Sequence, residues 1–476
     1  MSGKSEVVEL QHQVGNGWDS PPGDHGYEGE GIKTGTADDA VDMHRMGKKQ
    51  EFKRNFRSFS VLGLSSVIMG TWGAFLSSAS FSIINGGLAG TVWVFIAAAI
   101  AVTAFGSGNV ILQMAALGNP GYVPTPWQGT LMTMAVVLFS MFFNTVGAKH
   151  LPLFESLILF LHIFGFFAVL IPLWVLAPKV PAKEVFTSFE NYGGWPSIGV
   201  SCIVGQLTAT GSLGGSDSPA HLAEEIRKAS TTIPRIMITT IILNGFLGVV
   251  MVITFCFCVT DIMKMFVLST SAFPYVDVFY AATGSTGGTI AMVAVGAALG
   301  ICGNLSVLAA GSRQAWAFAR DDGLPWSGWL RKIMVIGTPI PLNAIATSLS
   351  ITVIVSLLNL GSVTAFNSIV GLLSGSGGVS YAISISCVLW RKLTGQPLPR
   401  SPFSLGRYGI PINIIAVLYC LFTTVLSFFP LFAAVTVEYM NYGSVMFVGV
   451  AAISIVYYFV HGRHVYKGPV VNINYN

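Results

Sequence analysis

The glycine-rich stretch from Gly214 to Arg235 contains the residues best suited to bind a ligand. It interrupts an apolar sequence with glycines, one carboxylate near the break, Asp217, and the start of a helix. The apolar residues before it, 197–213, are barely long enough to cross a bilayer. A helix that breaks within a membrane must turn its freed backbone N–H and C=O groups toward protein or a ligand, because lipid cannot bond them. The stretch therefore predicts a binding site for a small polar molecule.

Asp217 has two interpretations. It precedes Ser218 and Pro219, the order expected of a helix N-cap followed by proline in the first turn. Its carboxylate also suits direct contact with a substrate ammonium group or with a proton. The two roles are compatible, since one side chain can do both.

The composition places most of the chain in a membrane. Its mean hydropathy is +0.68, and 10% of its residues are charged, whereas soluble domains average about 25%. Residues 1–57 hold 18 of the 46 charged residues. We therefore expect a disordered cytoplasmic tail over 1–57, a transmembrane domain over 58–461 and a cytoplasmic C-terminal tail over 462–476.

Eleven apolar stretches follow the polar tail, and most are long enough to cross a membrane as helices. They predict an all-α polytopic membrane protein. All six cysteines lie inside these stretches, which favours small buried residues over disulfides or metal ligands. The stretches are 59–81, 91–117, 130–147, 154–177, 197–213, 236–259, 289–310, 343–360, 363–390, 411–431 and 442–461.

The basic residues predict which loops are cytoplasmic. Of the 25 Lys and Arg residues, 22 lie in the two tails and in the loops 148–153, 214–235, 311–341 and 391–410. Cytoplasmic loops carry an excess of Lys and Arg, so we expect these loops and both termini in the cytoplasm. The net charge of +4 is therefore a topology signal, and its dispersal over loops gives no sign of a nucleic-acid-binding patch.

The motifs of common enzymes do not occur in this sequence. It has no phosphate-binding glycine loop followed by Lys and Ser or Thr, no paired intramembrane carboxylates and no His/Cys ligand spacing. We expect no enzymatic activity, no cofactor and no metal site.

Two segments carry a family resemblance. The run SRQAWAFARDDGLP from Ser312 resembles the cytoplasmic signature of the amino acid–polyamine–organocation transporter superfamily. The run GSDSPAHLAEEI from Gly215 resembles its fungal amino acid/choline branch, which includes GABA and choline permeases. Further matches are TAFNSIV at 364–370 and SISCVLWRKL at 384–393. The resemblance implies secondary active import of a small amino or quaternary-ammonium compound, with protons as the coupling ion, across the plasma membrane.

The resemblance also implies two inverted five-helix repeats plus two C-terminal helices, with the first helix of each repeat unwound at the membrane middle. The unwound helix of the second repeat matches 197–213 and its glycine-rich break. That of the first repeat matches 59–81, where two glycines flank Trp72. Many members of the branch carry Glu where this chain has Gly73, so this chain lacks a carboxylate that could meet a cationic substrate.

The two breaks together predict the substrate site. Backbone amides near Gly70 and Ser216 suit a carboxylate, because helix N-termini favour anions. Trp72 suits a quaternary ammonium group through a cation–π attraction of about 0.5–2 kcal/mol. It suits a core position equally well, and the glycines also suit close helix packing. The predicted substrate-binding residues are Met69, Gly70, Thr71, Trp72, Gly73, Gly214, Gly215, Ser216 and Asp217.

Charged residues predict a cytoplasmic gate or brace beneath this site, made by Glu224, Glu225, Arg313, Arg320 and Asp321. The alternatives are a solvated helix over the two glutamates, with pairs three and four residues apart, and an ordinary topogenic loop around the arginines.

Three functions fit the resemblance. Import of an amino compound is the first, a non-transporting nutrient sensor of the same fold is the second, and an inactive truncated permease is the third. The third arises because the inner halves of the second and third helices, with their connection, are absent from the stretch 91–117. The predicted topology needs an odd number of crossings between Asn85 and Lys149. We therefore expect 91–117 to enter from outside, turn near Ala104–Gly108 and return, or to form a distorted single span.

The charge bias generates a topology prediction. Epitope tags inserted in the loops 214–235, 311–341 and 391–410 should remain unlabelled when intact cells are treated with an impermeant antibody or reagent. A tag in the loop 178–196 serves as the control, because that loop is expected outside. External labelling of any of the three loops would contradict the topology.

Overall fold

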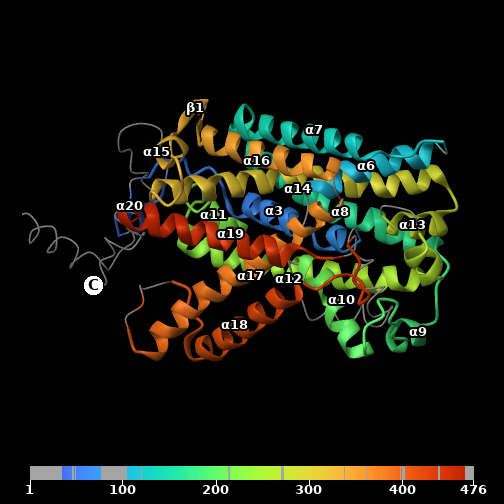
Figure 1. The fold of residues 1–476 in the computed structure, drawn as a ribbon. Coiled ribbons are helices and arrows are strands. Elements are labelled where there is room, and N and C mark those ends of the chain that lie inside the picture. Colours follow the sequence, from blue (N-terminus) through green and yellow to red (C-terminus); the bar gives the residue numbers. More distant parts are fainter. Residues whose placement is uncertain are drawn as a thin grey trace, which may run out of the picture.

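The computed structural model describes residues 35–45, 48, 50–76, 104–119, 121–212, 215–269, 273–336, 338–361, 363–396, 398, 402–437 and 440–466. This part of the chain is a bundle of long helices with one small antiparallel hairpin, in which β1 (Met334–Ile336) pairs with β2 (Thr338–Ile340) (Figure 1). Seven of the described helices are long and apolar enough to cross a membrane. The prediction of an all-α polytopic protein is confirmed.

Each of the eleven apolar stretches contains a helix, although residues 77–103 lie outside the described residues. The α-helices are α2 (Ala37–Arg45), α3 (Ser58–Met69), α6 (Ala104–Gly118), α7 (Pro126–Thr145), α8 (Leu151–Leu176), α9 (Ala182–Thr187), α10 (Ile198–Ser212), α11 (Ser218–His221), α12 (Ala229–Cys258), α13 (Tyr275–Thr283), α14 (Thr286–Arg320), α15 (Ser327–Leu330), α16 (Leu342–Gly361), α17 (Val363–Leu393), α18 (Gly409–Leu426), α19 (Gly443–Tyr457) and α20 (Arg463–Val465). Shorter 3-10 or π turns are Ala148–His150, Met263–Val267, Gly406–Tyr408 and Tyr458–Gly462.

Local sequence signals explain where several helices begin. Thr125 precedes α7, Pro126 occupies its first turn, and the Gln128 side chain reaches back to the backbone N–H of Thr125 at 3.0 Å. This is a capping box with proline at the start of the helix. Ser285 precedes α14 and accepts a hydrogen bond from the N–H of Gly288 at 3.3 Å. These caps fix where α7 and α14 begin, and α14 forms part of the candidate site.

Helix α3 lies among α8, α12 and α14, in the middle of the bundle (Figure 1). Its contact with α8 is unusually close at Gly63, where an added Cβ would lie 1.9 Å from the carbonyl oxygen of Glu155. Only glycine fits at that backbone-to-backbone contact, as expected of small residues between membrane helices. The largest apolar core cluster extends from this helix to α8, α12, α13 and α14.

The segment before α3 corrects the prediction of a disordered tail over 1–57. Residues 37–45 form helix α2, and Asp39, Phe52, Arg54 and Phe56 are buried against the bundle. The prediction is wrong for this part, because its charged residues find partners on the bundle rather than water, which composition alone does not reveal. Residues 1–34 and most of the C-terminal tail, 467–476, lie outside the described residues.

The structure shows no turn at Ala104–Gly108, where the sequence predicted one. Helix α6 runs unbroken from Ala104 to Gly118, so any reversal of the chain lies before Ala104, outside the described residues. A Cβ on Gly118 would lie 3.8 Å from Ile290, which places the end of α6 beside the start of α14 and next to α13. The opposite end of α14 carries the loop predicted to be cytoplasmic. Helix α6 therefore runs away from the predicted cytoplasmic side, from Ala104 toward Gly118. This direction agrees with the odd number of crossings required by the charge bias.

The direction of α6 gives a direct test. A single cysteine at Gly118 should be labelled from outside on intact cells, because Gly118 lies at the end of the bundle opposite to the predicted cytoplasmic loops. A cysteine at Lys149, in the predicted inner loop, is the control and should be labelled only after permeabilisation. Labelling of Gly118 from the inside alone would overturn the topology of α6.

Candidate functional site

The first predicted break lies at Gly70, where α3 ends. Gly70 adopts a left-handed conformation with φ 44° and ψ 28°, and its N–H donates to the carbonyl of Ser66 at 2.9 Å. The chain returns to helix immediately, over residues 71–76. A left-handed residue is the usual end of a helix and favours glycine. The break is therefore a sharp kink between two helical pieces of one span.

The second break lies between α10 and α11, and it contacts the first. Leu213 and Gly214 lie outside the described residues, and Gly215 follows with φ 81°. A Cβ on Gly215 would lie 2.3 Å from Cγ2 of Ile68 in the last turn of α3. Both the backbone conformation and the space thus require glycine at this position. The two breaks, far apart in sequence, meet at this contact.

A cavity opens beside the first break. Gly70, Trp72 and Gly73 form one side of it, as the sequence predicted. The sequence predicted one site lined by both breaks. Gly215, Ser216 and Asp217 are not among the described residues that line this cavity. Met69 and Thr71 are buried beside it rather than in its wall. The remaining walls come from Ser107 and Val110 of α6, His162 and Val169 of α8, Tyr275 and Phe279 of α13, and Met292, Val293, Gly296, Leu299 and Gly300 of α14.

Several polar atoms around this cavity have no hydrogen-bond partner among the described residues. Trp72 is 1% exposed, and these atoms are its indole Nε1, the hydroxyl of Thr71 and Nε2 of His162. The Trp72 and His162 rings lie 6.1 Å apart, and Trp72 also contacts Phe166 at 6.0 Å. Buried polar atoms are normally satisfied by protein or by bound molecules. The cavity is therefore equipped to bind water or a small polar ligand between aromatic rings.

Asp217 forms part of a second polar cluster. Its Oδ2 lies 3.2 Å from Nε2 of His221, and Nδ1 of His221 lies 2.8 Å from Oε1 of Gln314 in α14. The Tyr381 hydroxyl of α17 also donates to Asp217. Asp217 occupies the N-cap position of α11, with proline in the first turn as predicted, although its side chain makes no capping hydrogen bond. Its carboxylate contacts His221, which in turn contacts Gln314 of α14.

The predicted brace residues all form ion pairs between separate elements. Arg313 Nε lies 2.8 Å from Glu225 Oε1, Arg320 lies 2.5 Å from Glu224, and Asp321 pairs with Lys48 at 2.6 Å. The alternative of a solvated helix over Glu224 and Glu225 is wrong. These residues lie in a chain of turns, and their partners are on α14 rather than on their own segment.

Sequence analysis missed Glu155, a fully buried carboxyl on α8. Both of its oxygens accept from the hydroxyl of Ser306 on α14, at 2.8 and 2.9 Å. Cys302 of α14 is the titratable neighbour facing it, and the backbone of Gly63 of α3 lies against its helix. The available signal was a single acidic residue inside the apolar run LPLFESLILF. Its place near the end of the run gave it the look of a residue at the membrane boundary. No group of His, Cys, Asp and Glu residues suited to a metal occurs in the described part of the chain.

The chain is similar to several known proteins. The amino acid permease family profile matches residues 58–453. A Macrophomina phaseolina protein named for amino acid and polyamine transport is 30% identical over 349 residues, 72% of this chain and 76% of its own. The choline transporter of Saccharomyces cerevisiae is 31% identical over 368 residues, 76% of this chain and 64% of its own.

An uncharacterised amino-acid permease of Schizosaccharomyces pombe is 28% identical and covers more of the chain. It takes in 93% of this chain and 91% of its own length. The aligned length of 507 exceeds the 476 residues of this chain, so the relative carries residues that face gaps here. That relative is therefore longer within the aligned region, as expected if this chain lacks helical segments.

The contact between the breaks predicts a selective loss of stability. Gly215→Ala should lower the melting temperature of the detergent-solubilised protein, because the φ of 81° and the contact with Ile68 together cost more than about 1 kcal/mol. Ile68→Ala in the same chain should restore part of the loss. Gly73→Ala is the matched control, since no atom lies within 4 Å of its Cβ position. Equal melting temperatures for the two alanine variants would contradict the contact.

Proposed function

Because the chain belongs to the amino acid permease family, we propose that it imports a small amino compound into the cell by proton-coupled secondary active transport. The observation that carries the proposal is the contact between two helix breaks beside a cavity with unpartnered polar atoms. Broken helices supply backbone N–H and C=O groups to substrates in such transporters. The charge bias supports cytoplasmic termini, and import across the plasma membrane is proposed from the family resemblance.

The substrate class follows from the cavity walls. Trp72, Tyr275 and Phe279 supply aromatic faces, and the described lining contains no carboxylate. An ammonium group would be held by ring faces and by carbonyls near Gly70, rather than by an ion pair. Choline, GABA and other amino acids remain the candidates, and one relative is named for choline and others for amino acids.

Glu155 is the proposed proton carrier. A charged group within a membrane helix costs about 2.5 kcal/mol or more unless it is paired. The described surroundings of Glu155 offer one hydroxyl and one thiol but no cation. The neutral acid is therefore the stable form while the site is closed, and a proton can leave when α8 and α14 separate. Protonation and helix packing are coupled by that requirement.

An uptake assay tests the function. In a permease-deficient fungal host, the chain should take up one of labelled choline, GABA or a panel of amino acids, in competition with the unlabelled compound. Asp217→Asn should reduce this uptake several-fold at equal surface level, because it weakens the acceptor for His221 and Tyr381. Surface delivery without uptake of any compound would favour the sensor or the inactive permease instead.

Proton coupling has its own test. Wild-type uptake should fall as external pH rises, whereas Glu155→Gln should lose concentrative uptake while retaining exchange of substrate across the membrane. Glu184→Gln is the control, because Glu184 is exposed on α9. A Glu155→Gln variant that still accumulates substrate with the pH profile of the wild type would exclude Glu155 as the carrier.

A further inference from the structure

The segment before α3 is attached to the bundle by ion pairs, hydrogen bonds and buried side chains. We propose that residues 35–57 form an N-terminal clasp that holds the inner ends of the two broken helices together and so controls opening of the cytoplasmic face. The clasp comprises helix α2 and the described residues between it and α3. This proposal rests on the proposed transport function, because opening of the cytoplasmic face is a step of transport. The test below needs no known substrate.

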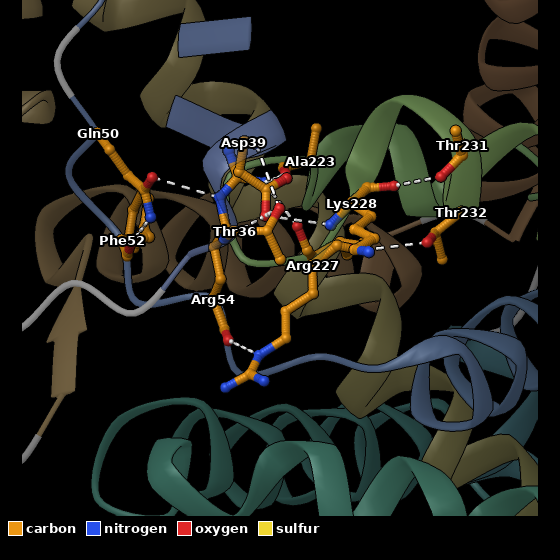
Figure 2. Close-up of polar contacts among 11 residues, drawn as sticks. Thr36, Asp39, Gln50, Phe52, Arg54, Ala223, Arg227, Lys228, Thr231 and Thr232 are labelled. Carbon is orange, nitrogen blue, oxygen red and sulfur yellow. Dashed lines mark hydrogen bonds and ion pairs between the residues drawn. The ribbon is translucent and has the colours of Figure 1, made fainter. Parts of the chain in front are cut away.

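The centre of the clasp is a buried ion pair. Arg54 Nη1 lies 3.1 Å from Asp39 Oδ1, and the two side chains are 3% and 1% exposed. The other carboxylate oxygen of Asp39 accepts from the backbone N–H and the hydroxyl of Thr36, at 3.0 and 2.9 Å, and from the backbone N–H of Lys228 at 3.2 Å. Asp39 thus fixes the start of α2 and joins it to the residue before α12 (Figure 2).

Arg54 connects the clasp to the turns between α11 and α12. The same guanidinium nitrogen donates to the carbonyls of Ala223 at 3.2 Å and Ile226 at 2.6 Å. In return, Nε of Arg227 donates to the carbonyl of Arg54 at 3.2 Å, as Figure 2 shows. One arginine therefore satisfies Asp39 and two carbonyl groups at the end of the second broken helix. Burial lowers the pKa of Arg54, and Asp39 opposes that effect.

The backbone next to α3 is joined to the same turns. The N–H of Phe56 donates to the carbonyl of Glu225 at 3.0 Å, and the N–H of Arg227 donates to the carbonyl of Phe56 at 3.1 Å. These two bonds form a parallel bridge between Phe56 and Ile226. Both side chains belong to one buried apolar cluster with Leu64 of α3 and Leu222. The bridge begins two residues before α3, so α3 cannot leave the turns without breaking it.

The outer part of the clasp reaches the end of α14. Lys48 pairs with Asp321, and the Phe52 ring packs edge-on against Trp316 at 4.6 Å. The guanidinium of Arg320 lies over the Trp316 ring, 4.4 Å from its centre. The clasp thus contacts three parts of the bundle that come from distant regions of the sequence.

The clasp can control opening because its contacts join the two broken helices at a second point. Gly215 and Ile68 join the broken helices at the break, and the clasp joins them again at their inner ends. Two attachments make α3 and α11 move as one unit. A buried ion pair contributes little net stability compared with apolar packing, but losing one partner is strongly destabilising. Such a pair suits a contact that must be either fully formed or fully released.

The experiment measures access from the cytoplasm. Ser218→Cys in a cysteine-free chain provides the probe, because Ser218 is 2% exposed at the start of α11. Inside-out vesicles are treated with an impermeant maleimide, and the labelling rate is measured per folded molecule. Asp39→Asn and Arg54→Gln should each raise the rate about tenfold or more, and together no more than either alone. Asp38→Asn, the exposed neighbour in α2, and Lys53→Gln should leave it unchanged.

A milder pair of variants guards against misfolding. Lys48→Glu should raise the rate about twofold to fivefold, because its ion pair with Asp321 is partly exposed. Adding Asp321→Lys should restore the original rate by reversing both charges. Unchanged labelling in Asp39→Asn, Arg54→Gln and Lys48→Glu, at equal thermal stability, would overturn the clasp. Changed labelling in a chain that transports nothing would support the clasp and reject the proposed transport function.

Discussion

The requirement that every backbone polar group in a membrane find a partner governs this structure. Two helices break within the bundle, and each break is tolerated because protein surrounds it. Gly70 ends α3 with its N–H bonded to Ser66, and Gly215 packs directly on Ile68. The left-handed backbone favours glycine at both breaks, and the contact with Ile68 also requires it at Gly215. The cavity beside Trp72 is lined by the kink at Gly70 and by the helical segment that follows it.

Charge is distributed according to the same constraint. Ion pairs gather where the turns after α11 meet the end of α14, and Arg313 and Arg320 of α14 each contact a glutamate in those turns. Inside the bundle, Glu155 has a single hydroxyl partner in Ser306. The two regions therefore differ in kind: ion pairs connect elements at the predicted cytoplasmic end, whereas an isolated carboxyl within the helices favours a neutral form and hence a bound proton.

The segment before α3 extends the network of charges. Arg54 and Asp39 attach it to the turns that follow α11, and Lys48 attaches it to the end of α14. Motion of the first broken helix is consequently linked to motion of the second. Under the proposed transport function, such linked motion would open the cytoplasmic face by moving both broken helices together.

The sequence alone determined the class and the breaks. Apolar length requires a polytopic helical protein, and glycines in short apolar runs locate Gly70 and Gly215, since these effects depend on local composition. The bias of Lys and Arg predicts which loops are cytoplasmic. Tertiary structure decided which residues meet. It separated Asp217 from the cavity, buried Glu155 against Ser306, and ordered Asp39 and Arg54 in a segment whose composition predicts disorder. Partners distant in sequence set these outcomes, because burial and ion pairing depend on what packs opposite a side chain rather than on its neighbours in the chain.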